Sequence, residues 1–275
     1  MDLHRSKWEA LYNARSRFFR DQSGELHWLD TLISETPVFN PEGWELAEGC
    51  TKGSREDKSL NDVADDIERS ARRARKRIFE YMLCTYELTE FVTLTFDPAK
   101  VPDRRDYADI VKRFGRWLDN MVRRNGLTYI FVPERHKDGA VHFHGMINPG
   151  VLRTVDSGTV RVPDHKKPLR IATADRLRIP QEQRQTVYNL PQWKYGFSTL
   201  IHIDGDRAAC CGYISKYCTK QNKAGGRYYL HGGKVREPEC EFFDVDFAAA
   251  DGEAFTVAGG KWKMQKADLF GGDGA

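Results

Sequence analysis

The sequence predicts an α+β protein, with an antiparallel β-sheet and flanking helices, preceded by a helical amino-terminal extension. Three observations lead to this fold class. Short runs of β-branched and aromatic residues recur between residues 91 and 203, stretches with helical spacing of apolar residues alternate with them, and turn residues separate them. In chain order the pattern is strand, helix, strand, strand, long polar excursion, strand, helix. Such an order favours a sheet covered by helices.

The first third of the chain is expected to be mainly helical. Leu3 to Asp21 carries apolar residues at intervals that suit a helix, whereas the prolines and glycines of residues 28–58 suggest loops and short pieces. A strongly helical pattern then runs from about Leu60 to Leu88, with acidic residues near its start. We therefore expect residues 1–88 to form a helical extension before the sheet.

The middle of the helix expected at residues 60–88 is rich in arginine, and two interpretations of this basic run are open. A run of like charges on a helix is usually a solvated face. An acidic start followed by a basic middle also suits a helix laid along the phosphates of DNA. In that second case the contacts would come from Arg72, Arg73, Arg75 and Lys76.

The sheet itself is expected within residues 89–235. Its first strand, Phe91–Phe96, is β-branched and aromatic and is predicted to be buried. An amphipathic helix follows at Tyr107–Asn125 and is closed by Gly126, the residue type that most often ends helices. The further strands are expected at residues 127–132, 141–147 and 195–203.

Residues 148–194 are polar and basic with scattered prolines, too long for a tight turn, and we expect an insertion there. One interpretation is a solvated excursion without a binding role. The other is a basic segment that follows a single nucleic-acid strand. Its cationic residues include Arg161, Lys166, Lys167, Arg170, Arg176 and Arg178.

An octet at residues 213–220 is predicted to be a helix, with Asp204 or Asp206 as its amino-terminal cap. Positions i, i+3, i+4 and i+7 share one helix face, and here they hold Tyr213, Lys216, Tyr217 and Lys220. The opposite face carries small or apolar residues suited to packing on a sheet, Cys211, Ile214 and Cys218. Cations beside a phenol favour the phenolate and can also meet a phosphate. The octet is thus a candidate nucleophile site, or an amphipathic helix with snorkelling lysines.

A second motif lies upstream, around two histidines separated by one residue. On a strand, His142 and His144 share a face while Phe143 faces the core. A turn through residues 137–139 would bring Glu134, at the end of the preceding apolar run, beside them. Two imidazoles and one carboxylate with open positions suit Mg²⁺ or Mn²⁺, and zinc fits the same ligands. His136 and His202 are better explained as satisfied or exposed histidines.

Composition bounds the class of protein. At 275 residues, with 40% hydrophobic and 30% charged residues, the chain suits a soluble globular protein. No apolar stretch approaches the ~18 residues of a membrane span, and the start lacks the apolar segment of a signal peptide. The six cysteines form no Cys-x-x-Cys pair, which favours a reducing cytoplasm. The net charge of +3 is too small to indicate nucleic acid by itself.

Taken together, these residues resemble the HUH endonuclease superfamily, and more narrowly the rolling-circle replication initiators of bacteriophages and plasmids. The matching motifs occur in order, and that order is far more specific than any single piece. They are Phe91–Phe96, then Glu134 with His142-Phe-His144, then Tyr213-Ile-Ser-Lys-Tyr217. The resemblance covers roughly residues 65–235.

The resemblance implies a ferredoxin-like or RNA-recognition-like sheet in an HUH catalytic domain at residues 89–235, followed by a tail at residues 236–275. It implies DNA nicking and strand joining, in which Tyr213 or Tyr217 attacks a phosphate, leaving a 5′-phosphotyrosine and a 3′-hydroxyl that primes a polymerase. Lys216 would stabilise developing charge, while Lys220 and Arg227 would hold flanking DNA. The expected partners are single-stranded DNA at a replication origin, a host helicase and a polymerase, in a bacterial cytoplasm. Because no phosphate-binding Gly-x-x-x-x-Gly-Lys-Ser/Thr loop occurs, no built-in helicase is expected.

Several alternatives are open at this point. A relaxase or a transposase would share the tyrosine chemistry, and one working tyrosine would suffice for either. A metal-dependent hydrolase using water would leave no covalent adduct. A non-catalytic module that binds single-stranded nucleic acid would need aromatic stacking residues on the sheet but not the three clustered ligands.

Overall fold

The computed structural model describes residues 3–5, 11–39, 44–46, 60–163, 165, 167–220, 226–243, 254–257 and 260–265. The chain divides into two compact units. We call residues 64–236 the core unit, and residues 1–63 together with 237–275 the terminal unit. Each is described by itself.

The core unit contains an eight-stranded sheet in which every described pairing is antiparallel, in the order β12-β6-β7-β5-β11-β10-β8-β9. The α+β fold class is therefore confirmed. The strands are β5 (Glu90–Phe96), β6 (Tyr129–Arg135), β7 (Val141–Ile147), β8 (Val155–Arg161), β9 (Leu169–Arg170), β10 (Gln185–Asn189), β11 (Gly196–His202) and β12 (Leu230–Gly232).

The two faces of this sheet have different roles, and β5 shows it most clearly. Val92, Leu94 and Phe96 are buried, whereas the alternate residues Thr93 and Thr95 are only partly buried. The expectation of a buried strand thus holds for one face only. The period of two along a strand sends the apolar set into one core and leaves the other set for a site.

Helix α2 (Tyr107–Asn125) covers the apolar face. Its Phe114 ring stacks on Phe143 of β7 with centroids 3.9 Å apart. The side chain of Asp106 accepts hydrogen bonds from two backbone amides at its start, and Gly126, with φ of 71°, ends it. Both caps satisfy backbone groups that a helix end leaves unpaired, so the helix starts and stops at defined residues.

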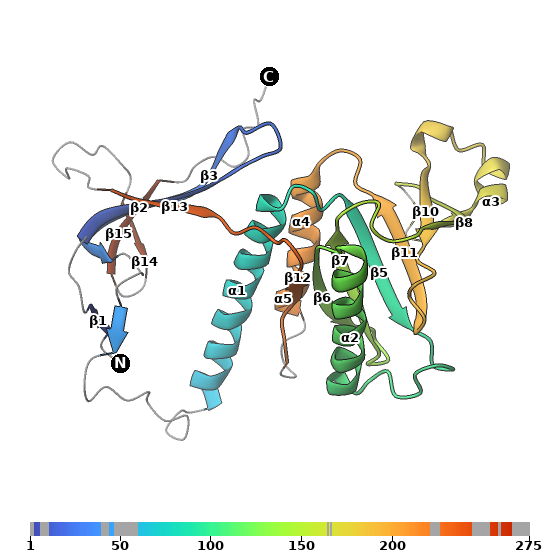
Figure 1. Ribbon diagram of the computed structural model, residues 1–275, viewed down its shortest axis with the longest axis horizontal. Helices are drawn as coiled ribbons and strands as arrows, with labels where there is room; N and C mark the ends of the chain where they lie inside the picture. Colours follow the sequence, from blue (N-terminus) through green and yellow to red (C-terminus); the bar gives the residue numbers. More distant parts are fainter. Residues whose placement is uncertain are drawn as a thin grey trace. The chain divides into compact units, whose positions relative to one another are not determined.

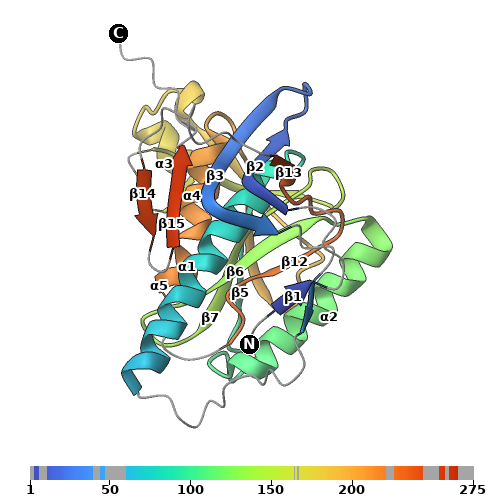
Figure 2. The same cartoon turned by 90° about the vertical axis from the view of Figure 1, so that its left-hand side faces the viewer.

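Helices α4 (Arg207–Ser215) and α5 (Tyr217–Lys220) lie on the other side of strands β5–β7 from α2 (Figures 1 and 2). The expected packing face is confirmed, because Cys211, Ile214 and Cys218 are all buried. The Sγ of Cys211 lies 3.9 Å from the Sδ of Met146 on β7. The opposite face of these two helices is therefore left for polar and aromatic groups.

Residues 148–194 add strands to the sheet. Strands β8, β9 and β10 extend its edge beyond β11, and α3 (Ile171–Arg176) and a 3₁₀ turn, η3 (Gln181–Gln183), complete the insertion. Val160, Val162 and Ala174 form a small separate core there. The insertion is thus anchored to the sheet by backbone pairing and by a core of its own. Of its cationic residues, Lys166 lies outside the described residues.

The terminal unit corrects the helix expected over Leu3–Asp21. The described residues there form β1 (Leu3–Arg5) and β2 (Leu11–Arg20), and β3 (Leu26–Phe39) and β4 (Trp44–Leu46) occupy much of the region expected to be loops. Helix α1 (Leu60–Cys84) matches the expected helix, so only this part of residues 1–88 is helical among those described.

Strand β2 is stabilised by partners that its local pattern does not reveal. Arg17 pairs with Asp30 across β2 and β3, with Nε to Oδ1 at 2.7 Å, and Phe18 packs edge-on against Trp28. The residues expected to form a tail supply three strands to the same five-stranded sheet, β13 (Glu239–Phe243), β14 (Ala254–Val257) and β15 (Gly260–Gln265). Strand pairing between chain ends outweighs helical spacing here.

Helix α1 belongs to the core unit from Ala64 onward. Phe79 of α1 lies against Gly212 of α4, and the ring of Tyr81 faces His231 of β12. Whether residues 89–235 fold as a domain without α1 stays a prediction. Within the described part of the chain, no helix is long and apolar enough to cross a membrane.

Arg207 ties the end of α1 to the start of α4. Its guanidinium donates to the backbone carbonyls of Met82, Leu83, Thr85 and Leu88, at 3.3 Å to Leu83 and 2.7 Å to Thr85. The last carbonyls of a helix have no partner inside it, and a cation also complements the negative end of the helix dipole. Arg207 therefore fixes the turn between α1 and β5.

Replacing Arg207 by alanine should lower the free energy of unfolding by about 2–3 kcal/mol, because partly buried carbonyls lose a charged donor. Urea unfolding followed by circular dichroism measures this loss. The exposed Arg116 on α2 offers a matched control, and Arg116→Ala should stay within about 0.5 kcal/mol of wild type. Equal stability of the two variants would contradict the role assigned to Arg207.

Glu90 generates a pH-dependent prediction. It is buried, and burial raises the pKa of its carboxyl, with the charge of His202, 3.5 Å away, acting in opposition. A raised folded-state pKa contributes stability below the unfolded pKa, and this contribution is lost as pH rises through the folded pKa. Glu90→Gln should therefore gain stability relative to wild type as pH increases from about 4.5 to 8. Urea unfolding curves at several pH values test this, and a constant difference between the proteins would contradict it.

Candidate active site

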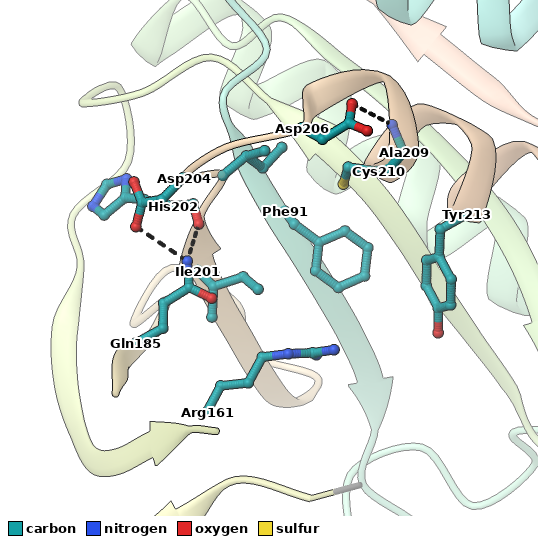
Figure 3. Close-up of a pocket in the computed structure, with 11 residues that line it drawn as sticks. Phe91, Arg161, Gln185, Ile201, His202, Asp204, Asp206, Ala209, Cys210 and Tyr213 are labelled. Atoms are coloured by element: carbon teal, nitrogen blue, oxygen red, sulfur yellow. Dashed lines mark hydrogen bonds between the residues drawn. The ribbon is translucent and has the colours of Figure 1, made fainter. Parts of the chain in front are cut away.

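The predicted tyrosine octet is helical in the structure. The carboxylate of Asp206 caps α4 by accepting a hydrogen bond from the backbone amide of Ala209 at 2.9 Å (Figure 3). Lys216 keeps right-handed helical geometry between α4 and α5, so the chain continues as one helical path. Asp206 is therefore the cap, one of the two candidates that the sequence offered.

Tyr213 and Tyr217 meet at their hydroxyl groups. The Tyr217 hydroxyl donates to the Tyr213 oxygen at 2.5 Å, and the two rings pack edge to face. Tyr213 is 42% exposed whereas Tyr217 is 5% exposed. Lys216 lies with its Nζ 4.0 Å from the ring centroid of Tyr213 and 5.7 Å from that of Tyr217. The expected convergence of two phenols and one ammonium group is present, and it is asymmetric.

The polar surroundings of Tyr217 do not favour its ionisation. Burial raises the pKa of Tyr217, and its hydrogen bond to Tyr213 and the negative charge of Glu134 raise it further. Its ring stacks on His144 of β7, with centroids 4.9 Å apart. Tyr213 instead packs edge-on against Phe91 of β5 and faces solvent on its other side. The buried phenol is thus a hydrogen-bond donor to the exposed one.

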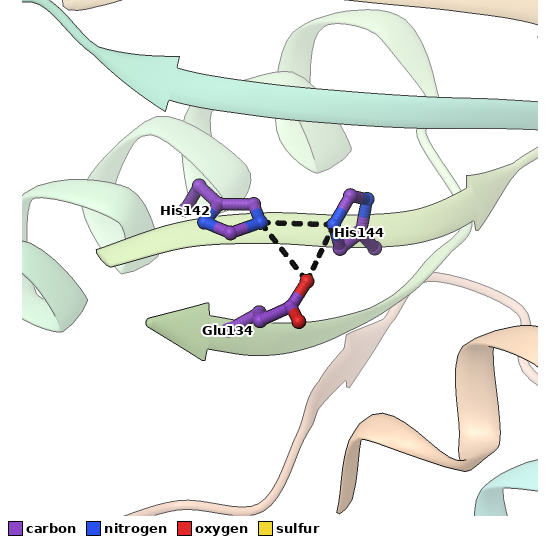
Figure 4. A group of neighbouring side chains, drawn as sticks. All are labelled: Glu134, His142 and His144. Carbon is purple, nitrogen blue, oxygen red and sulfur yellow. Dashed lines mark hydrogen bonds and ion pairs between the residues drawn. The ribbon is translucent and has the colours of Figure 1, made fainter. Parts of the chain in front are cut away.

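Glu134, His142 and His144 form a triangle on the same face of the sheet (Figure 4). Nε2 of His142 lies 2.9 Å from Nε2 of His144 and 3.1 Å from Oε2 of Glu134, and the third side measures 3.0 Å. The hairpin produces this geometry, because β6 and β7 pair with Glu134 directly opposite His142. Phe143, between the histidines, is buried in the core as expected.

The donor set fits a divalent cation. Three lone-pair donors with edges near 3 Å match bonds of about 2.1 Å at right angles, the geometry of an octahedral site with one face supplied by protein. Hydrogen bonds alone leave the triangle poorly satisfied, since each imidazole carries at most one proton that can be shared among three inward-facing atoms. The three residues would therefore hold the cation and leave its other positions open.

Local electrostatics keep these ligands in the forms that bind cations. Burial lowers the pKa of His142 to about 4, and the neighbouring His144 and His136 lower it further, so its lone pair is available at neutral pH. For Glu134, burial raises the pKa, but the hydrogen bonds and charges of His144 and His142 outweigh it and the net pKa is lowered. Glu134 is therefore a carboxylate at neutral pH.

Groups outside the triangle orient the two imidazoles. Oγ1 of Thr93 lies 2.9 Å from Nδ1 of His144, which selects the tautomer that turns Nε2 inward. His136 stacks on His142 with ring centroids 3.9 Å apart, a packing role in keeping with its exclusion from the ligand set. Nδ1 of His142 is buried and has no hydrogen-bond partner among the described residues.

Gly145, directly after the second histidine, allows β6 and β7 to approach closely at this point. A Cβ there would lie 2.3 Å from the carbonyl oxygen of Ile130 and 2.4 Å from the Phe131 ring. Real Cβ atoms do not tolerate such contacts, so only glycine permits the observed pairing. The position of the triangle thus depends on a residue that carries no side chain.

The predicted DNA-binding residues are distributed differently. Arg72, Arg73, Arg75 and Lys76 are exposed on α1, where Arg72 pairs with Glu68 at 2.5 Å and Lys76 lies 3.8 Å from Glu80. Arg75 is close enough to Cys218 of α5 for its charge to oppose the rise in pKa that burial gives that thiol. Arg227 is exposed beside α2, where its carbonyl accepts from Tyr107 at 2.6 Å. The side chain of Lys220 lies outside the described residues. DNA contacts by this set stay a prediction.

Two residues of the site escaped sequence reasoning, Thr93 and Phe91. Phe91–Phe96 alternates apolar and polar residues at Val92, Thr93, Leu94 and Thr95, and that alternation is the signal that one face of the strand is not core. Its partner strand is revealed only by the sheet, where Thr93 pairs with His144.

Residues 89–222 match the family model of the replication-associated protein ORF2. The match supports a replication-associated protein. The matched region begins one residue before β5 and ends two residues after α5, so it contains Glu134, both histidines and both tyrosines. No curated protein and no solved structure matches the chain.

Replacing Thr93 by valine should weaken Mn²⁺ binding about tenfold, because groups that orient metal-bound histidines typically contribute 10- to 100-fold to affinity. Thr95→Val is the matched control, since Thr95 lies on the same strand face but donates to the carbonyl of Phe197. His144→Ala should abolish specific binding. Isothermal titration of the purified protein with Mn²⁺ measures all three, and equal affinities for the two threonine variants would contradict the role of Thr93.

Proposed function

We propose that the chain is an HUH-type DNA-nicking and strand-joining replication initiator, which cleaves single-stranded origin DNA by metal-assisted attack of a tyrosine. One observation carries the proposal. Two tyrosine hydroxyls lie 2.5 Å apart, and the ring of one of them stacks on a histidine of the three-ligand triangle. A phosphate bound at the triangle's open side would therefore lie beside both candidate nucleophiles. The family match of residues 89–222 supports the replication role.

In this proposal, Glu134, His142 and His144 hold Mg²⁺ or Mn²⁺ beside the scissile phosphate. A divalent cation at this site, when bound, withdraws charge from a phosphate oxygen and so favours nucleophilic attack. The residues contribute a neutral imidazole pair and a carboxylate, which suit a hard cation. Zinc fits the same donor types less well at right angles, since its protein sites are mostly tetrahedral.

The tyrosine oxygen forms a bond to phosphorus while the bond from phosphorus to the 3′ oxygen breaks. The phenol loses its proton, and the leaving 3′ oxygen gains one, so the products are a 5′-phosphotyrosine and a free 3′-hydroxyl. The reaction conserves the phosphodiester bond, so the reverse attack by a 3′-hydroxyl rejoins a strand. A polymerase would extend the 3′-hydroxyl in rolling-circle replication, with unwinding by a host helicase.

The asymmetry of the pair assigns the first cleavage to Tyr213. Its oxygen accepts the hydrogen bond from Tyr217, and a donated hydrogen bond stabilises a phenolate. The ammonium group of Lys216, 4.0 Å from the Tyr213 ring centroid, stabilises the same negative charge. Tyr213 is also the exposed member, which an incoming strand reaches first. Tyr217 would attack the regenerated junction in the second step.

The test is a denaturing gel of the protein incubated with a labelled pool of single-stranded DNA and Mn²⁺. Tyr213→Phe should lower the initial rate of covalent adduct formation by at least 10²-fold, because the activated oxygen is lost. Tyr217→Phe should reduce that rate by only about tenfold, since it removes one hydrogen bond to the phenolate. The double variant should give no adduct, and a chelator should abolish the adduct of the wild type.

Different patterns point elsewhere. Loss of the adduct only with Tyr217→Phe would reverse the assignment of the first nucleophile. Cleaved strands without an adduct would indicate a hydrolase that uses water. Strand binding with neither product, with the ligand triangle intact, would leave a single-strand binding module as the better description. Tyr188→Phe, a tyrosine of β10 outside the octet, is the control for nonspecific loss.

A further inference from the structure

A pocket of about 280 Å³ opens beside Tyr213, on the side of α4 where the insertion joins the sheet (Figure 3). Its floor comes from Phe91 and Ile201 of the two central strands, and Asp204 and Asp206 line it from the turn before α4. The insertion supplies the remaining wall, with Arg161 at the end of β8 and Gln185 at the start of β10. The pocket therefore exists only because the insertion extends the sheet at this edge.

The pocket and the exposed tyrosine share a wall, because Tyr213 is itself one of the lining residues. A strand that brings a phosphate to the Tyr213 hydroxyl must pass the mouth of the pocket. The volume lies at the small end of the range of about 300–1,000 Å³ that is usual for ligand sites. Such a space suits one flat ring system, and it is too small for a base pair.

Hydrogen-bond acceptors predominate in the polar lining. Nε2 of Gln185 donates to the carbonyl of His202 at 2.5 Å and to Oδ2 of Asp204 at 3.3 Å, which orients the amide. Its Oε1 has no partner among the described residues. The carboxylates of Asp204 and Asp206 add further acceptor positions. The site therefore offers mainly acceptors to a guest.

Arg161 is the exception in this lining. Its side chain extends below the Phe91 ring toward Tyr213 (Figure 3), it is exposed, and no carboxylate pairs with it among the residues that the structure describes. An unpaired guanidinium next to an acceptor-lined pocket is suited to the phosphate of the same guest. Phe91 offers an aromatic surface to its ring.

We propose that this pocket binds one unstacked base of the DNA strand next to the scissile phosphate, and that it accepts bases with an exocyclic amino group and rejects thymine. Adenine, cytosine and guanine each present an amino donor, whereas thymine presents a carbonyl and a methyl group in its place. Thymine would leave the lining acceptors unpaired and facing a carbonyl oxygen, a mismatch that sites built for hydrogen bonding reject strongly. Arg161 binds the phosphate of the same nucleotide. The inference rests on the proposed function, and it makes the insertion a determinant of origin sequence.

The experiment uses a single-stranded DNA pool with a randomised central segment. The full-length protein is incubated with the pool and Mn²⁺, the covalent adducts are isolated under denaturing conditions, and the joined and released strands are sequenced. With the wild type, thymine should be depleted about tenfold at one position next to the cleaved phosphate. Gln185→Leu should remove that depletion and leave the preferences at other positions unchanged.

Two matched controls separate the pocket from general effects. Asn189→Leu removes the same amide chemistry at the other end of β10, and Lys194→Ala removes an exposed cation from the turn before β11. Both should keep the wild-type base profile and yield. Arg161→Ala should reduce binding of all sequences alike and lower the slope of log affinity against log salt by about one, because one phosphate contact is lost.

A second selection is independent of the chemistry. Protein carrying both Tyr213→Phe and Tyr217→Phe is mixed with the same pool in chelator, and the bound strands are sequenced. If the wild type forms no adduct, the proposed function fails. Thymine depletion in the bound strands that disappears with Gln185→Leu would then still support the pocket. Thymine at every position in both selections, or depletion that persists in Gln185→Leu, would overturn the inference.

Discussion

The antiparallel pairing of β6 with β7 is the constraint on which the site depends. Its register sets Glu134 opposite His142, and the period of two along β7 then brings His144 to the same triangle. A slip by one residue would turn both imidazoles into the core and Phe143 out of it. Close approach at Gly145 and burial of Phe143 under α2 oppose such a slip. The ligand geometry is therefore a consequence of core packing on the opposite face.

The tyrosines are positioned by a different set of contacts. Cys211, Ile214 and Cys218 bury the back of α4 and α5, which turns Tyr213, Lys216 and Tyr217 toward the ligand triangle. Arg207 joins the start of this helix to the end of α1, so α1 supports the site although none of its residues belongs to it. The result is an unequal pair, in which one phenol is exposed and accepts a hydrogen bond from the buried one.

The insertion gives the central sheet a second function in our proposals. Strands β8–β10 continue the sheet beyond β11, and their ends bring Arg161 and Gln185 to the pocket beside Tyr213. Chemistry and sequence preference would thus be divided between the central strands, which hold the ligand triangle, and the added edge, which lines the pocket. Such a division would let the insertion change the preferred sequence without disturbing the ligands.

The sequence by itself determined the α+β class, α2 with its glycine cap, the hairpin that carries the triangle, and the faces of the tyrosine octet. These features depend on residues close in the chain, where periodicity and turn chemistry report local structure directly. Only the tertiary structure decided the rest. Strand β2 reads as a helix until β3 and the distant β13 pair with it, Thr93 has no visible role until β5 lies beside His144, and Gln185 reaches Tyr213 through sheet pairing. Contacts between residues far apart in the chain leave no periodic trace, because side-chain spacing records only which face is buried and not which partner buries it.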